Sequence, residues 1–199
     1  LVGSEMCIRD RSISGQDIEV AEVVKATMDE ICKTPVEIKP HKRFKGFHIS
    51  KSDTNFAKLL QEEYPELIGT AHEKYIPDKI LQASYDDLRN YIAGLFDTDG
   101  HNSSSHGRRS LSFTTVNLEN ARRVQQALLS LGIACCLKPK KTSCNGKESI
   151  AYRITIHSEF YDEFLEIIPM RIERKCIPSN SQRNNYSNKL PCLLYTSDA

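Results

Sequence analysis

The amino-acid sequence predicts an α+β protein made of two similar halves. A gapless shift of 100 positions superposes residues 12–31 on residues 112–131, with apolar residues at matching places. Within each segment the apolar residues recur at steps of three and four, which is typical of the buried face of an amphipathic helix. Strand-like segments and a second helix follow both copies in the same order, so we expect a pseudo-symmetric fold.

The repeated unit is built around the superposed helix. Its matched apolar pairs are Ile18 with Leu118, Ala21 with Ala121, Val24 with Val124, Met28 with Leu128 and Ile31 with Leu131. In the first copy we expect two further strands and a helix, at residues 36–39, 47–51 and 55–63. In the second copy the corresponding elements are expected at residues 134–138, 151–157 and 159–168.

A further amphipathic helix is expected between the two copies. Its apolar face is formed by Leu88, Ile92, Leu95 and Phe96. Ser84 or Asp86 can cap its start, and Gly100 can end it. Ala93 and Gly94 are small where a core helix usually carries bulk, and glycine costs about 1 kcal/mol there relative to alanine. Such a small pair allows the backbone of another helix to approach closely, or it accommodates a neighbouring core side chain.

Composition excludes several classes of protein. The chain has 199 residues and a net charge of +1, which neither marks nor excludes a nucleic-acid binder. It lacks a run of about 18 apolar residues that could span a bilayer, and it lacks a secretory signal, so we expect a cytoplasmic or nucleoid-associated protein. Walker, Rossmann and serine-nucleophile motifs are absent.

Both ends of the sequence read as foreign to the fold. Residues 1–11 and 192–199 resemble translated sequencing adaptors, so we expect them to be non-native and residues 178–191 to be a tail or linker. We also expect the native protein to continue in both directions. The five cysteines outside these ends form no C-x-x-C pair and no zinc-spaced set, which favours reduced structural thiols.

One pair of motifs carries a resemblance to a known family. Residues 91–100 read YIAGLFDTDG, and Lys74–Pro77 upstream read KYIP. With a repeat copy on each side, these motifs resemble those of the LAGLIDADG (DOD-type) homing endonucleases, which are intein-associated or free-standing. The resemblance covers about residues 12–175 and implies site-specific cleavage of double-stranded DNA.

The family resemblance also implies an architecture. It is a pseudo-symmetric pair of half-domains, in which two antiparallel sheets form a saddle on DNA and helices cover the other face. We expect an N-terminal half-domain at 12–77 that is truncated, because it lacks a motif helix. The C-terminal half-domain is expected at 78–177, with its motif helix at 87–100.

The resemblance assigns roles at the end of that motif helix. Phosphodiester hydrolysis needs an activated water and stabilised negative charge, and Mg²⁺ or another divalent cation can supply both. By correspondence with the motif, Asp99 is the metal-binding acid, Gly100 offers its carbonyl to the metal, and Asp97 is structural. Lys74 is expected to act near the scissile phosphate. Lys175 is a candidate counterpart of Lys74, although RIERK can equally be a basic helix end.

A calcium-binding loop is a further interpretation of residues 97–108, because Asp97 and Asp99 could be its first two ligands. It fails because His101 and Arg108 stand where that loop needs oxygen ligands.

Basic residues concentrate on or between the expected strands, whereas acidic residues concentrate on the helices. We expect the basic set to contact DNA phosphates, while polar strand residues read base edges. The set consists of Lys39, Lys42, Arg43, Lys45, Arg108, Arg109, Lys138, Lys140, Lys141, Lys147 and Arg153.

The first half has no counterpart of Asp99. The shift of 100 places that partner before residue 1, and the first copy contains no matching motif. We therefore expect the chain to lack double-strand cleavage and to expose the apolar face of Leu88 to Phe96. Nicking remains open, as does cleavage restored by the missing helix or by a second copy.

Three alternatives stay open. The parent protein could be an intein, although no His-Asn splice junction occurs in the sequence. A degenerate relative could only bind DNA or assist RNA intron splicing. An unrelated α+β domain would be favoured if the basic strands did not share a face.

Overall fold

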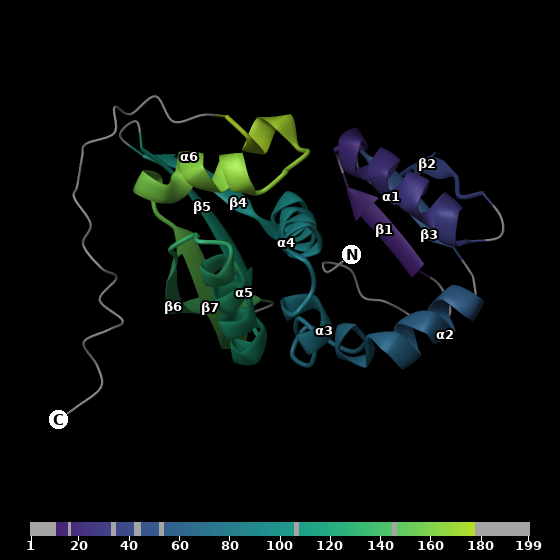
Figure 1. The fold of residues 1–199 in the computed structure, drawn as a ribbon, viewed down its shortest axis with the longest axis horizontal. Coiled ribbons are helices and arrows are strands. Elements are labelled where there is room, and N and C mark those ends of the chain that lie inside the picture. The colour runs from purple at the N-terminus through teal and green to yellow at the C-terminus, as the bar shows by residue number, and fades with distance from the viewer. Residues whose placement is uncertain are drawn as a thin grey trace.

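Two small α+β units make up the protein, in a computed structural model that describes residues 11–15, 17–32, 35–41, 45–51, 54–105, 108–144 and 147–177. Figure 1 shows one unit in purple and blue and the other in teal, green and yellow. Lys42, Arg43, residues 1–10, the tail at 178–191 and the end segment at 192–199 lie outside the described residues.

The N-terminal unit is a three-stranded antiparallel sheet with helices. Its elements are β1 (Arg11–Gly15), α1 (Ile18–Ile31), β2 (Ile38–Pro40), β3 (Phe47–Lys51) and α2 (Thr54–Glu63). The strand order is β1-β3-β2. Ala21 and Met28 of α1 pack against Phe47 and Ile49 of β3, and Phe56 of α2 joins this core. Burial of these apolar side chains stabilises the unit.

A short connection leads to the C-terminal unit. It contains the 3-10 turn η1 (Pro65–Leu67) and the short helix α3 (Asp78–Leu81). The C-terminal unit then consists of α4 (Tyr85–Asp99), β4 (His101–Ser105), β5 (Arg108–Thr115), α5 (Leu118–Ser130), β6 (Cys136–Cys144), β7 (Lys147–Ile156), α6 (Ser158–Ile167) and η2 (Glu173–Lys175). Its sheet is antiparallel with the order β4-β5-β7-β6. Side chains of α4, α5 and α6 share one core with the inner face of this sheet.

The two units repeat one topology. The elements β1, α1, β2, β3 and α2 match β5, α5, β6, β7 and α6, and the strand order β1-β3-β2 matches β5-β7-β6. The registers agree too, because Ile49 pairs with both Ile13 and Ile38 as Ile154 pairs with Phe113 and Leu137. The predicted α+β class and its pair of half-domains are confirmed. Within the described residues, the first unit has no counterpart of α4 and β4.

Helix α4 lies between the C-terminal sheet and the N-terminal unit (Figure 1). It starts two residues before the predicted boundary, and Ser84 caps it by accepting a hydrogen bond from the Asp87 amide at 3.2 Å. The side chain of Phe96 packs against Phe113 and Phe164, with ring centroids 6.0 and 5.1 Å away.

The expectation that the apolar face of α4 is exposed is wrong. Leu88, Ile92, Leu95 and Phe96 are at most 4 % exposed. They belong to the core that α4 forms with α5, α6 and the sheet, so this face is already occupied within the C-terminal unit.

None of the helices in the described part of the chain combines the length and apolar character that a bilayer crossing requires.

Candidate active site at the end of helix α4

Helix α4 ends where glycine is the only residue that fits. The Gly100 amide donates to the carbonyl oxygen of Phe96 at 3.0 Å, and Gly100 itself is buried between α4 and β4. A Cβ at this position would lie 2.2 Å from the same oxygen. Asp99 is therefore the last helical residue, and its carboxylate lies at the negative end of the helix dipole.

Asp97 is buried in the interior of the fold. Its side chain is 3 % exposed, and its carboxylate accepts hydrogen bonds from the backbone N–H groups of Arg171 and Ile172 at 3.1 to 3.2 Å. Burial raises the pKa of Asp97, while the two backbone N–H groups oppose that shift. The carboxylate thus fastens the segment after α6 to the last turn of α4.

Asp99 reaches solvent, unlike Asp97. Desolvation by surrounding protein raises the pKa of Asp99, and the positive charge of Lys175 opposes that shift. The described residues contain no group of three His, Cys, Asp or Glu side chains that could hold a metal alone. A lone carboxylate suits Mg²⁺ when phosphate oxygens and waters complete the coordination.

Lys175 lies against the same end of α4. Its side chain is 5 % exposed, and its ammonium donates to the carbonyl oxygens of Phe96 at 3.0 Å and Asp97 at 2.5 Å. Burial, followed by the charge of Arg174, lowers the pKa of Lys175, while Asp97 and Asp99 oppose the shift. The structure thus brings Lys175 and Asp99 to one helix end.

The backbone of Lys175 is held by a buried polar network. Asn102 of β4 donates its side-chain amide to the carbonyl oxygen of Lys175 at 3.0 Å and to the Tyr161 hydroxyl at 2.7 Å. Tyr161 is fully buried, and its hydroxyl lies 3.1 Å from the carbonyl oxygens of both Lys175 and Ile177. These contacts fix the position of η2.

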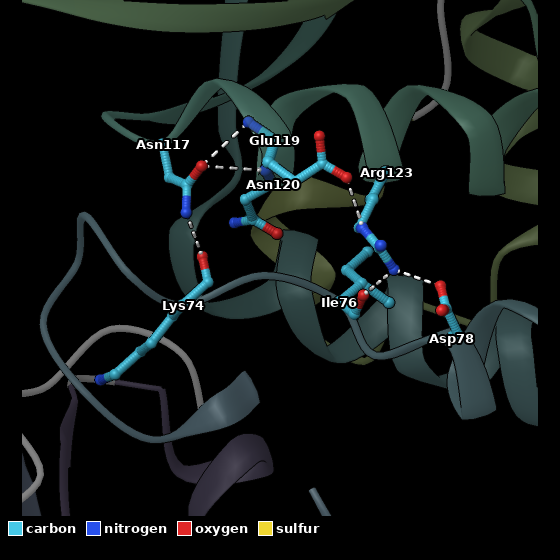
Figure 2. A network of polar contacts seen from close by, with 7 residues as sticks. All are labelled: Lys74, Ile76, Asp78, Asn117, Glu119, Asn120 and Arg123. Carbon is cyan, nitrogen blue, oxygen red and sulfur yellow. Dashed lines mark hydrogen bonds and ion pairs between the residues drawn. The ribbon is translucent and has the colours of Figure 1, made fainter. Parts of the chain in front are cut away.

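Lys74 is similarly buried, at 9 % exposure, in the connection between the two units. Figure 2 shows its backbone carbonyl accepting a hydrogen bond from the Asn117 amide, at 3.0 Å, while its ammonium points away from α5. Two residues further, the Ile76 carbonyl accepts from Arg123 at 2.9 Å. Arg123 also stacks over Tyr75, with its guanidinium carbon 4.7 Å from the ring centroid.

A second K-x-I-P motif links the two lysines. Lys175, Cys176, Ile177 and Pro178 repeat the pattern of Lys74 to Pro77. Sequence reasoning that treated RIERK as a possible helix end missed this match, although it was readable. The motif therefore follows the last helix of both units.

Part of the expected DNA-binding set shares the outer face of the C-terminal sheet. Strand alternation places Lys138, Lys140 and Arg153 on the side away from the core residues Phe113 and Ile154. Arg153 pairs with Lys138 on one side and Thr114 on the other. Its Nε is buried and lacks a hydrogen-bond partner among the described residues.

The rest of the set divides between faces. Arg108 is the first residue of β5 and pairs with Ser105. Arg109 alternates to the inner face, where its charge and a hydrogen bond oppose the rise that desolvation causes in the pKa of Tyr161. Lys141 is exposed but falls at an inner-face position of β6, and Lys147 lies at the start of β7 opposite Cys144.

In the N-terminal sheet, Lys39 occupies the place that Lys138 has in the C-terminal sheet. It pairs with His48, which pairs with Ser14, and these three match Lys138, Arg153 and Thr114. Lys45 is exposed in the turn before β3.

The comparison with protein families decides the identity of the C-terminal unit. Residues 86–169 match the family described as LAGLIDADG-like domain. The C-terminal unit is a LAGLIDADG-like domain. The match includes most of α4, and the recognition of a LAGLIDADG homing endonuclease from residues 91–100 is confirmed.

Solved structures share the LAGLIDADG fold across both units. The chain is similar to a mesophilic variant of the homing endonuclease I-DmoI, with a TM-score of 0.56, 14% identity, and coverage of 80% of this chain and 79% of that one. The homing endonuclease I-WcaI, bound to its DNA recognition sequence, gives a TM-score of 0.57 at 16% identity, with coverage of 85% and 75%. The fold thus includes the N-terminal unit, which the family match leaves out.

Two curated relatives are much longer proteins. Replicative DNA helicase DnaB of Mycobacterium intracellulare is 30% identical over 116 residues, which are 58% of this chain and 20% of the helicase. ATP-dependent DNA helicase Hel308 of Methanocaldococcus jannaschii is 30% identical over 147 residues, 68% of this chain and 12% of that protein. This chain therefore spans only a small part of the length of each relative.

Proposed function

We propose that this chain is the DNA-cutting part of a LAGLIDADG homing endonuclease, which hydrolyses a phosphodiester bond at a specific site in double-stranded DNA. The observation that carries the proposal is the arrangement at the end of α4. There an exposed carboxylate, Asp99, and a buried ammonium, Lys175, meet at one helix end. A hydrolytic site on DNA needs an acid for the metal and a positive charge for the phosphate.

Asp99 is the residue that would hold a divalent cation, with Gly100 beside it as a source of a backbone carbonyl. Desolvation by neighbouring protein and the negative end of the helix dipole both disfavour the charged carboxylate, so a bound cation would relieve both effects. Bound Mg²⁺ would activate water and neutralise charge on the phosphate. Crystal structures of the similar endonuclease I-DmoI hold DNA together with calcium or manganese.

Lys175 would stabilise negative charge on the scissile phosphate and help to orient that phosphate beside Asp99. Because burial lowers the pKa of Lys175, this residue gives up its proton more readily than a surface lysine does. Lys74 would serve the same role for the second strand, at a site completed by an acid from a first motif helix or from a second copy of the chain.

The outer faces of the two sheets would form the DNA-binding surface. The matched rows at Ser14, His48 and Lys39 and at Thr114, Arg153 and Lys138 support this assignment, because they place basic residues at equivalent points of both sheets. Basic side chains would contact phosphates, and neighbouring polar residues would read bases.

An intein is the favoured origin of the chain. A segment with a homing-endonuclease fold matches 20% of one helicase and 12% of another, which is the pattern expected of an element inserted into unrelated host proteins. The half-domains at 12–77 and 78–177 would then be the endonuclease portion of that element.

A second candidate function is DNA binding without cleavage, or assistance to RNA intron splicing. One observation favours it: the Lys175 ammonium is buried and already donates to the carbonyl oxygens of Phe96 and Asp97, so it contributes to folding without any role in cleavage.

The test is selection of bound duplexes from a randomised library, followed by nicking and cleavage assays with Mg²⁺. We expect nicking of the selected duplex by the chain, and cleavage of both strands once a first motif helix is restored. Asp99→Asn should abolish cutting while binding persists, whereas Glu166→Gln, an exposed charge change on α6, should alter neither. Binding without cutting by the restored form would instead establish the binding-only function.

A further inference from the structure

Equivalent residues of the two units each contact the lysine segment of the opposite unit. Asn117 occupies the N-cap position of α5, and Asp17 occupies the N-cap position of α1, so the shift of 100 relates them. Asn117 contacts Lys74, which follows the last helix of the first unit. Asp17 contacts Arg174, which immediately precedes Lys175 after the last helix of the second unit.

We propose that Asn117 and Asp17 are positioning residues. Each holds the K-x-I-P lysine of the opposite unit in place: Asn117 holds Lys74, and Asp17 holds Lys175 through Arg174. The proposal rests on the proposed function for its catalytic meaning, because it assumes that Lys74 and Lys175 act on DNA. The crossed contacts themselves are independent of that function.

The side chain of Asn117 makes hydrogen bonds in both units. Its side-chain oxygen accepts from the amides of Glu119 and Asn120 at 2.9 and 3.3 Å and thereby caps α5, while its amide group donates to the Lys74 carbonyl (Figure 2). Any good N-cap residue would satisfy α5, but serine, threonine and aspartate lack the amide donor that reaches Lys74.

Asp17 contacts Arg174 of the opposite unit and does not cap α1. Its side chain makes no hydrogen bond to the described backbone of α1, although an N-cap bond is usually worth about 1 kcal/mol. Both carboxylate oxygens instead accept from Arg174, at 2.6 Å from Nε and 2.7 Å from Nη2. This two-point contact fixes the orientation of η2, which presents Lys175 to the last carbonyls of α4.

Hydrogen exchange on the full chain without DNA tests the crossed pattern. Asn117→Ser keeps a capping oxygen but removes the donor, so the amides of Lys74 and Tyr75 should exchange roughly fivefold faster, the effect of one lost net hydrogen bond. Asp17→Arg and Arg174→Asp should instead accelerate the amides of Lys175 and Cys176.

The charge-swapped double variant Asp17→Arg with Arg174→Asp should restore slow exchange at Lys175 and Cys176. Amides of the core residues Leu128 and Phe164 report global stability and should not change. Equal acceleration of both lysine segments by each variant, or failure of the double variant to restore protection, would overturn the proposal. Asn117→Asp, which retains the cap, provides a second variant if Asn117→Ser fails to fold.

A ¹³C NMR titration of the Lys175 side chain separates positioning from a direct charge effect. Asp17 raises the pKa of Lys175 through its charge, so Asp17→Asn acting through charge alone would lower that pKa further. Release of the ammonium from its buried site would raise the pKa instead. A rise supports positioning, and a fall or no change contradicts it. DNA cutting enters neither experiment, so failure of the proposed function would be recognised separately.

Discussion

Asp97 and Asp99 are two residues apart, yet the structure predicts opposite consequences of removing them. Asp97→Ala removes a buried carboxylate that accepts from the N–H groups of Arg171 and Ile172. Both N–H groups would lose their acceptor, and that of Ile172 would remain buried without one. Asp99→Asn removes a solvent-exposed charge from a helix end that disfavours it.

The magnitudes follow from these contacts. A hydrogen bond to a charged group contributes roughly 1.5–3 kcal/mol, and two are lost, but relief of the desolvation that raises the pKa of Asp97 offsets part of this loss. We expect Asp97→Ala to lower the free energy of unfolding by about 2–4 kcal/mol. For a chain of this length this lowers Tm by roughly 5–15 °C. Asp99→Asn should change the free energy by less than about 0.5 kcal/mol.

Urea denaturation at pH 7, followed by circular dichroism, measures both variants on one scale. Because the folded-state pKa of Asp99 is raised, its charged form destabilises the fold above that pKa, so Asp99→Asn should shift the midpoint slightly upward. Asp97→Asn retains one acceptor oxygen and should fall between the other two variants. Destabilisation by Asp99→Asn as large as that by Asp97→Ala would contradict the different roles of the two carboxylates.

Three further substitutions probe helices α1 and α4. Gly100→Ala should destabilise the protein by roughly 1–3 kcal/mol in the same denaturation assay, because its Cβ would lie 2.2 Å from the Phe96 carbonyl oxygen. Gly94→Ala should stabilise the isolated chain by up to about 1 kcal/mol, since no described atom lies within 4 Å of the new Cβ; a loss instead would reveal a closely packed neighbour. Asp17→Asn should destabilise by up to about 1 kcal/mol near neutral pH. The Arg174 hydrogen bond lowers the pKa of Asp17, so that difference should disappear as pH falls below the ordinary value of 3.8 and through the folded-state pKa; a difference that persists in acid would contradict the ion pair.

Much of the fold was predictable because it depends on local patterns. The three-and-four spacing of apolar residues located α1, α4 and α5, since each helix buries one face. The shift of 100 anticipated that α1 and α5 are equivalent elements, because both copies carry the same apolar pattern at matching positions.

The strands of the C-terminal unit were less predictable. β6 and β7 run to Cys144 and Lys147, well beyond the segments expected, because the hairpin extends past the core and its outer residues are polar. Their polar composition resembles a loop. In the sequence, the dipeptide Asn145-Gly146 is typical of a tight hairpin turn and therefore favours longer strands on both sides of it.

Tertiary contacts account for what the site prediction missed. The identity of Asp97 as a buried acceptor depends on Arg171 and Ile172, which are 74 and 75 residues away in the sequence. The exposure expected for the apolar face of α4 was wrong because α5, α6 and the sheet of the same unit cover it. Strand register, which a motif does not specify, places Arg109 on the inner face of the sheet with Phe113, and not on the outer face with Arg153.

The central claim is that the end of α4 binds a catalytic divalent cation, and Mn²⁺ tests it most directly. Mn²⁺ broadens NMR signals of nearby nuclei, so it should be titrated into the chain bound to its selected duplex while the backbone amides are observed. We predict selective broadening of the amides from Asp97 to His101, lost in Asp99→Asn and retained in Glu166→Gln. Broadening that is absent there, or that survives Asp99→Asn unchanged, would contradict the account.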